Sequence, residues 1–124
     1  MLSDTMSQEI PPGLRSQIAK FQRLQEELQY VLTMKQQWQA QLYEIESALT
    51  ELEKVPEDRP VYKIVGSIMV SKDKESVVKE LKERKELIES QLETLKKQED
   101  MLRKQVEDLD KKLRSKLGGS EIAG

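Results

Sequence analysis

The sequence predicts a mostly α-helical fold: a long antiparallel two-helix coiled coil with a β-hairpin at the bend. Three observations predict it. Two stretches of nearly equal length, residues 12–54 and 73–117, repeat apolar residues at alternating spacings of three and four. A β-rich segment with a central Gly66-Ser67 pair lies between them. The 124 residues are 36% hydrophobic and 35% charged, a balance that suits long helices better than a globular core.

The first predicted helix covers residues 12–54 and follows a flexible arm, residues 1–11. Proline is accepted in the first turn of a helix, so Pro12 marks the start, and Val55 before Pro56 marks the end because a residue before proline avoids helical geometry. The seam of this helix is predicted to consist of Leu24, Leu28, Val31, Lys35, Trp38, Leu42, Ile45, Leu49 and Leu52.

Residues 55–72 are predicted to form a linker and a β-hairpin. A two-residue Gly66-Ser67 loop, with glycine first as a type II′ turn prefers, pairs Val65 with Ile68 and Ile64 with Met69. Alternation then places apolar residues on both faces. An isolated two-stranded hairpin is marginal in water, so we expect several copies or related subunits to share a sheet or barrel. A small hairpin that rests on the helix ends is the alternative.

The second predicted helix covers residues 73–117, with Ser71 or Asp73 as its cap, and a flexible tail follows over residues 118–124, where Gly118-Gly119 ends the helix. Its predicted seam consists of Val78, Leu81, Lys85, Ile88, Leu92, Leu95, Glu99, Leu102, Val106, Leu109 and Leu113. Antiparallel helices place seam residues opposite one another at a constant sum of residue numbers, which is 130 for Leu49 with Leu81. This match favours an intrachain coil, and an intermolecular coil stays an alternative.

Composition argues against an enzyme. The sequence has no His and no Cys, and it contains neither a phosphate-binding glycine loop nor a nucleophile elbow. Carboxylates on a narrow helical rod stay hydrated, so we expect no cofactor and no metal site. The net charge of -2 disfavours nucleic-acid and membrane surfaces, and no apolar run approaches the roughly 20 residues that span a bilayer. A cytoplasmic protein is the expectation.

The hairpin segment from Val61 to Val70, followed by Lys74, Glu75 and Val77 at the start of the second helix, resembles prefoldin, specifically its β-class subunits of archaeal type. The resemblance covers almost the whole chain. It implies a hexamer of two α-class and four β-class subunits, with hairpins that form a β-barrel platform. It also implies an ATP-independent holdase whose distal tips bind unfolded polypeptides, prevent their aggregation and deliver them to a group II chaperonin.

The resemblance assigns two sets of residues. The platform role, oligomerisation, falls on Val61, Tyr62, Ile64, Val65, Ile68 and Val70. The client-binding role at the tips falls on Met6, Ile10, Leu14, Ile18, Leu113, Leu117 and Ile122. For Leu14, Ile18, Leu113 and Leu117 the alternative is that they finish the coil.

The sequence is also compatible with two other functions. The chain is alternatively a structural coiled-coil spacer or tether that oligomerises through its hairpin; such a protein would form a dimer and would not protect unfolded proteins. Nucleic-acid binding through the basic run at residues 110–116 is the least favoured reading, because cations in a last helical turn already stabilise the negative end of the helix dipole. Such binding would show a steep dependence on salt.

Overall fold

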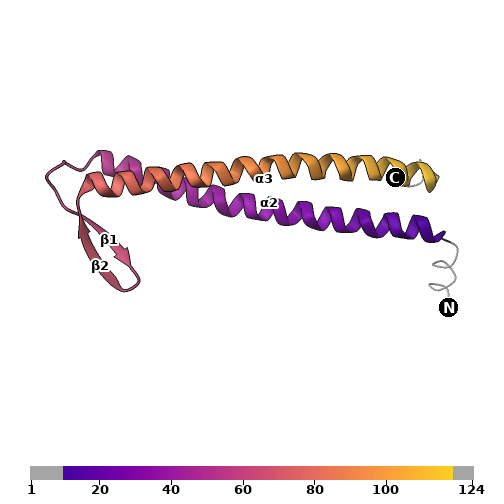
Figure 1. The fold of residues 1–124 in the computed structure, drawn as a ribbon, viewed down its shortest axis with the longest axis horizontal. Coiled ribbons are helices and arrows are strands. Elements are labelled where there is room, and N and C mark those ends of the chain that lie inside the picture. The colour runs from indigo at the N-terminus through magenta and orange to yellow at the C-terminus, as the bar shows by residue number, and fades with distance from the viewer. Residues whose placement is uncertain (1–9, 119–124) are drawn as a thin grey trace. The chain divides into compact units, whose positions relative to one another are not determined.

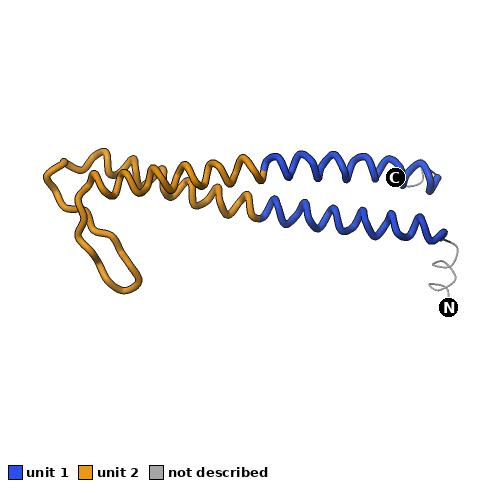
Figure 2. The backbone as a smooth tube through the Cα atoms, in the orientation of Figure 1, with its two compact units in different colours: residues 1–33, 96–124 blue, residues 34–95 orange. Residues whose placement is uncertain are grey.

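The computed structural model describes residues 10–118. Its elements are, in order, helix α2 (Pro12–Glu53), strand β1 (Val61–Val65), strand β2 (Ile68–Lys72) and helix α3 (Lys74–Lys116) (Figure 1). The chain divides into two compact units (Figure 2). The hairpin unit is residues 34–95, and the described part of the end unit is residues 10–33 and 96–118. The two long helices with an antiparallel hairpin between them confirm the predicted fold class.

A proline ends the first helix and a glycine follows the end of the second. At the end of α2, the N–H of Val55 donates to the carbonyl of Leu52 at 3.1 Å, a tightened last turn directly before Pro56. At the end of α3, Gly118 has a φ of 97°, which side-chain-bearing residues rarely adopt. The sequence predicts helices over residues 12–54 and 73–117, and the structure has Pro12–Glu53 and Lys74–Lys116.

Asp73 caps the start of α3, which decides between the two candidate caps. Its carboxylate accepts hydrogen bonds from the N–H of Ser76 at 3.0 Å and from the hydroxyl of Ser76 at 2.8 Å. These bonds satisfy a donor that the first helical turn cannot pair internally. They also favour the ionised carboxylate, so the Ser76 hydrogen bonds hold the pKa of Asp73 below its ordinary value.

The seam positions predicted for the hairpin unit are all buried or half-buried. Ile45, Leu52 and Ile88 are the buried apolar members, and Ile88 is only 1% exposed. Lys35 and Lys85, the predicted polar members of this seam, are both half-buried. Apolar residues repeated every 3.5 residues keep one stripe of each helix facing its partner, which explains why spacing alone identified the seam.

In the end unit, too, the buried residues belong to the predicted seam, and one of them is charged. Its buried apolar residues are Leu24, Val31, Leu102, Leu109 and Leu113, all from the predicted seam. The carboxylate of Glu99 lies among them at 5% exposure, and the Nε of Arg103 donates to it at 2.8 Å. The ammonium of Lys116 donates to the side-chain oxygen of Gln17 at 3.0 Å, so the end of α3 lies beside the start of α2.

The hairpin has the predicted register. Val65 pairs with Ile68, Ile64 with Met69 and Lys63 with Val70. Gly66 has a φ of 62°, and no described residue other than glycine has a positive φ, so Ser67 does not adopt the left-handed region. This combination fits a type II′ turn, in which only the first loop residue is left-handed.

Candidate functional site

Apolar side chains are exposed on both faces of the hairpin. The pairing places Val61, Val65, Ile68 and Val70 on one face, together with Lys63 and Lys72, and Tyr62, Ile64 and Met69 on the other. Val61 is half-buried and the other apolar side chains are exposed, with Ile64 at 71%. The structure therefore brings all six predicted platform residues together on one small sheet whose apolar surface is largely uncovered.

Glu80 of α3 ties one face of this sheet to the helix. Its carboxylate accepts a hydrogen bond from the ammonium of Lys63 and lies 3.8 Å from that of Lys72. Both lysines belong to the same face, so a single carboxylate holds both strands. The hydrogen bond from Lys63 holds the pKa of Glu80 below its ordinary value, and the positive charge of Lys63 adds a smaller effect in the same direction.

Acid is expected to loosen the start of α3 and its contact with the hairpin. The pKa values of Asp73 and Glu80 are both lowered in the folded chain, so their stabilisation is fully present above the ordinary carboxyl pKa and is lost as the pH falls through the lowered values. The unfolding temperature, measured from pH 6 to pH 2, should fall less steeply for D73N and E80Q. Asparagine also caps helices, so D73N keeps the cap and removes only the titration. Unchanged pH profiles would contradict this prediction.

Lys74 anchors the linker to the first residue of α3. Its ammonium donates to the carbonyl of Val55 at 2.8 Å and lies 3.3 Å from the carboxylate of Glu57. The side chain is only 13% exposed, so both interactions are partly shielded from water. These two interactions hold the linker between α2 and β1 against the first residue of α3. They therefore restrict the direction in which the hairpin extends from the helices.

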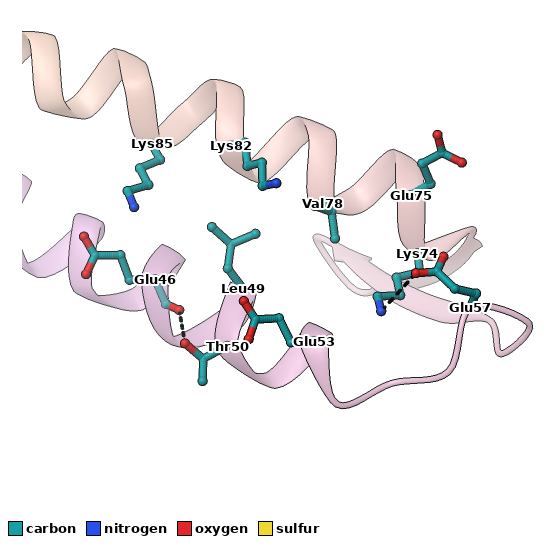
Figure 3. A pocket seen from close by; sticks show the side chains of 10 residues that line it. All are labelled: Glu46, Leu49, Thr50, Glu53, Glu57, Lys74, Glu75, Val78, Lys82 and Lys85. Atoms are coloured by element: carbon teal, nitrogen blue, oxygen red, sulfur yellow. Dashed lines mark hydrogen bonds and ion pairs between the residues drawn. The ribbon is translucent and has the colours of Figure 1, made fainter.

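A groove of about 690 Å³ lies between the helices near this anchor (Figure 3). In Figure 3, Lys82 and Lys85 of α3 point toward the α2 side, and Glu46 and Leu49 of α2 point toward α3. The groove mixes ammonium groups and carboxylates with the apolar side chains of Leu49 and Val78, and its lining includes neither His nor Cys.

The predicted client-binding residues divide by exposure. Ile10, Leu14 and Ile18 are half-buried, and Leu113 is buried in the seam of the end unit. Leu117 is 38% exposed directly after α3. Met6 and Ile122 lie outside the described residues. Leu117 is therefore the member of this set that presents the most accessible apolar surface in the described chain.

Spacing alone did not identify several exposed apolar side chains. Tyr30 and Met101 in the end unit lie outside the seam and line a hollow of about 490 Å³. Tyr43 and Leu87 in the hairpin unit are also exposed. Met69 belongs with the platform residues, and the strand alternation already placed it beside Ile64. The signal for the others was an apolar residue at a non-seam position.

Two further kinds of site would be recognisable in residues 10–118: a metal site and a membrane-spanning helix. No group of three or more His, Cys, Asp or Glu within residues 10–118 is arranged to hold a metal ion. Over the same residues, neither helix has an apolar stretch that would cross a bilayer.

Comparison with known proteins identifies the family. A family model described as "Prefoldin subunit" matches residues 15–120. Prefoldin subunit beta of Pyrobaculum islandicum is 47% identical over 81 residues, and this match spans 65% of each protein, slightly less than two thirds. Prefoldin subunit beta of Caldivirga maquilingensis is 40% identical over 112 residues, which cover 90% of this chain and 93% of that protein.

A solved structure agrees with the sequence matches. The prefoldin beta subunit from Thermococcus strain KS-1 is 37% identical, with a TM-score of 0.81 over 90% of this chain and 97% of that chain. The beta2 subunit from the same strain has a TM-score of 0.66 at 21% identity, which shows similarity of fold alone. The chain therefore belongs to the prefoldin family, a non-enzymatic family of chaperone type, as a beta subunit.

Proposed function

We propose that this chain is the beta subunit of a cytoplasmic prefoldin hexamer, with four copies assembled around two α-class subunits. The observation that carries the proposal is the hairpin, whose apolar side chains are exposed on both faces. A two-stranded sheet cannot bury both of its own faces, and its outer edges present unpaired backbone groups. Hairpins of related subunits that close into a barrel would cover faces and edges together.

The assembled protein would act as an ATP-independent holdase. Unfolded polypeptides would bind at the end unit, where Leu117 exposes apolar surface directly after α3 and Leu14 and Ile18 of α2 are half-buried. Several weak apolar contacts from several subunits give avidity without a rigid pocket, and they allow release. The proposed next step is delivery of the held polypeptide to a group II chaperonin.

Co-expression with an α-class prefoldin subunit tests this function. The expected result is a complex whose solution mass equals two α-class and four copies of this chain, and which suppresses aggregation of a chemically unfolded protein without nucleotide. A dimer of this chain without such protection would instead support a coiled-coil spacer or tether. Aggregation suppression that requires ATP would contradict the holdase assignment.

Replacing the exposed leucine of the end unit is expected to weaken client binding. L117S removes accessible apolar surface at the end of α3, so the hexamer should suppress aggregation less well at equal concentration. L87S is the matched control, because Leu87 is 60% exposed and belongs to the hairpin unit. Removal of residues 1–10 together with 118–124 should give a larger loss without changing the number of subunits. Equal activity of L117S and L87S would move client binding elsewhere.

A further inference from the structure

Tyr30 of α2 and Met101 of α3 share one hollow in the end unit, the blue unit of Figure 2. Their side chains are 66% and 58% exposed. Each directly precedes a buried seam residue, Val31 or Leu102, and these two residues also line the hollow. This site, called the Tyr30–Met101 hollow here, therefore presents an accessible aromatic ring and a thioether beside apolar side chains that the coil already holds in place.

The other flank of α3 in this unit is occupied by ion pairs. Arg103 comes two residues after Met101, so it projects about 200° around the helix from it. Its Nε donates to the carboxylate of Glu99 at 2.8 Å, and the Nε of Arg114 lies 3.1 Å from the carboxylate of Asp110. Arg103, Asp110 and Arg114 all line a separate hollow on that flank. The charges there are compensated within the helix, so that flank offers little to a charged partner.

The carboxylates of the Tyr30–Met101 hollow have no such partners. Glu26 and Glu27 line it and are exposed, and neither carboxylate takes part in a hydrogen bond or ion pair within residues 10–118. The lining contains one cationic group, the guanidinium of Arg23, so its net charge is negative. A cationic side chain of a bound molecule would be attracted to the two carboxylates and can also lie over the ring of Tyr30.

The hollow lies within reach of a polypeptide that is bound at Leu117. Met101 belongs to the same helix that Leu117 directly follows, and at 1.5 Å per residue the two are about 24 Å apart along it. An extended polypeptide covers this distance with about seven residues. One unfolded segment could therefore contact both places at the same time.

We propose that the Tyr30–Met101 hollow is a second client subsite, which binds an apolar side chain of an unfolded polypeptide together with a neighbouring Lys or Arg. The inference rests on the proposed holdase function and deepens it, since it names the class of segment that is held. Methionine adapts its shape to different apolar side chains, so the hollow accepts many sequences. A further subunit fits less well, because a stable interface buries about 800 Å² per partner and this hollow offers only a few side chains.

Binding of short unfolded peptides to the complex of this chain with an α-class subunit tests the subsite. Three fluorescently labelled peptides of Gly and Ser are compared by anisotropy. The first carries a Leu and a Phe-Lys pair about seven residues apart, the second carries the same residues side by side, and the third has Glu in place of Lys. We expect the first peptide to bind roughly tenfold more tightly than the second, because its two contacts act together. It should bind roughly threefold more tightly than the third, and added salt should reduce this difference.

A matched pair of double variants locates the second contact. Y30S/M101S removes the exposed apolar groups of the hollow and is expected to remove the advantage of the first peptide over the second. Y43S/L87S removes an exposed tyrosine and an exposed apolar side chain from the same two helices in the hairpin unit, and it should keep that advantage. Circular dichroism and solution mass check that both variants fold and assemble.

A second pair of variants tests the charge selection. E26Q/E27Q removes the two carboxylates and should abolish the preference for the Lys peptide over the Glu peptide, while the advantage of the spaced peptide stays. E44Q/E46Q makes the same change at exposed positions of α2 in the hairpin unit and should keep both preferences.

The outcomes separate this inference from the proposed function. Equal binding of the spaced peptide to the unmodified complex and to Y30S/M101S overturns the subsite, and so does equal binding of the Lys and Glu peptides to the unmodified complex. Aggregation suppression by the unmodified complex, measured in the same preparation, would leave the holdase function standing in either case. A complex that binds none of the peptides and does not suppress aggregation overturns both.

Discussion

Replacement of Ile88 by alanine is expected to lower the free energy of unfolding by about 2–5 kcal/mol, the range for truncating a fully buried aliphatic side chain. Ile88 is 1% exposed and is the largest fully buried side chain of the described residues. Chemical denaturation followed by circular dichroism measures the change.

The adjacent residue supplies the control for this experiment. Leu87 precedes Ile88 on the same helix but is 60% exposed, so L87A should change stability by no more than about 0.5 kcal/mol. Both variants should be measured at one protein concentration, because assembly contributes to apparent stability. Equal losses for I88A and L87A would show that Ile88 is not the central packing residue of the hairpin unit.

Replacement of Val65 by aspartate is expected to abolish assembly with the α-class subunit and to leave most of the helix content unchanged. Val65 is exposed in the isolated chain, so an aspartate there stays hydrated and the chain still folds. Inside a closed sheet the same carboxylate would lose its water without gaining a partner, at a cost of several kcal/mol. Solution mass and circular dichroism measure the two parts of this prediction.

Ser67 provides the corresponding control for Val65. It is an exposed residue of the two-residue loop, where aspartate is well tolerated, so S67D adds the same charge outside the strands. It should assemble as the unmodified chain does. An intact hexamer with V65D would refute the role of the hairpin as the assembly platform.

The regular parts of this fold were predictable because their signals are local. A seam repeats every three or four residues, so the spacing of Leu24 and Val31 places them on the same face of a helix without knowledge of the partner. The Gly66-Ser67 pair likewise set the strand register, since a two-residue loop leaves only one pairing for Val65. Each signal is contained in a few neighbouring residues.

The contacts that complete the candidate site were not predictable in this way. Lys63 and Glu80 are 17 residues apart and belong to different kinds of element, so no periodic pattern relates them. Lys74 reaches back to Val55 across the whole hairpin. The choice of Asp73 over Ser71 as the helix cap was also open, because both residue types cap helices. All three contacts depend on where the hairpin and the linker lie relative to the first turns of α3, which no local pattern specifies.

The exposed hairpin makes copies of this chain that lack partner subunits a problem for the cell. A copy made in excess of its companions keeps Ile64 and Met69 in water and retains two strand edges that any other extended chain can join. Such an unassembled copy is prone to aggregate with other proteins. We therefore expect balanced synthesis of the subunits, or rapid degradation of the surplus, to matter for the amount of functional protein as much as the stability of the helices.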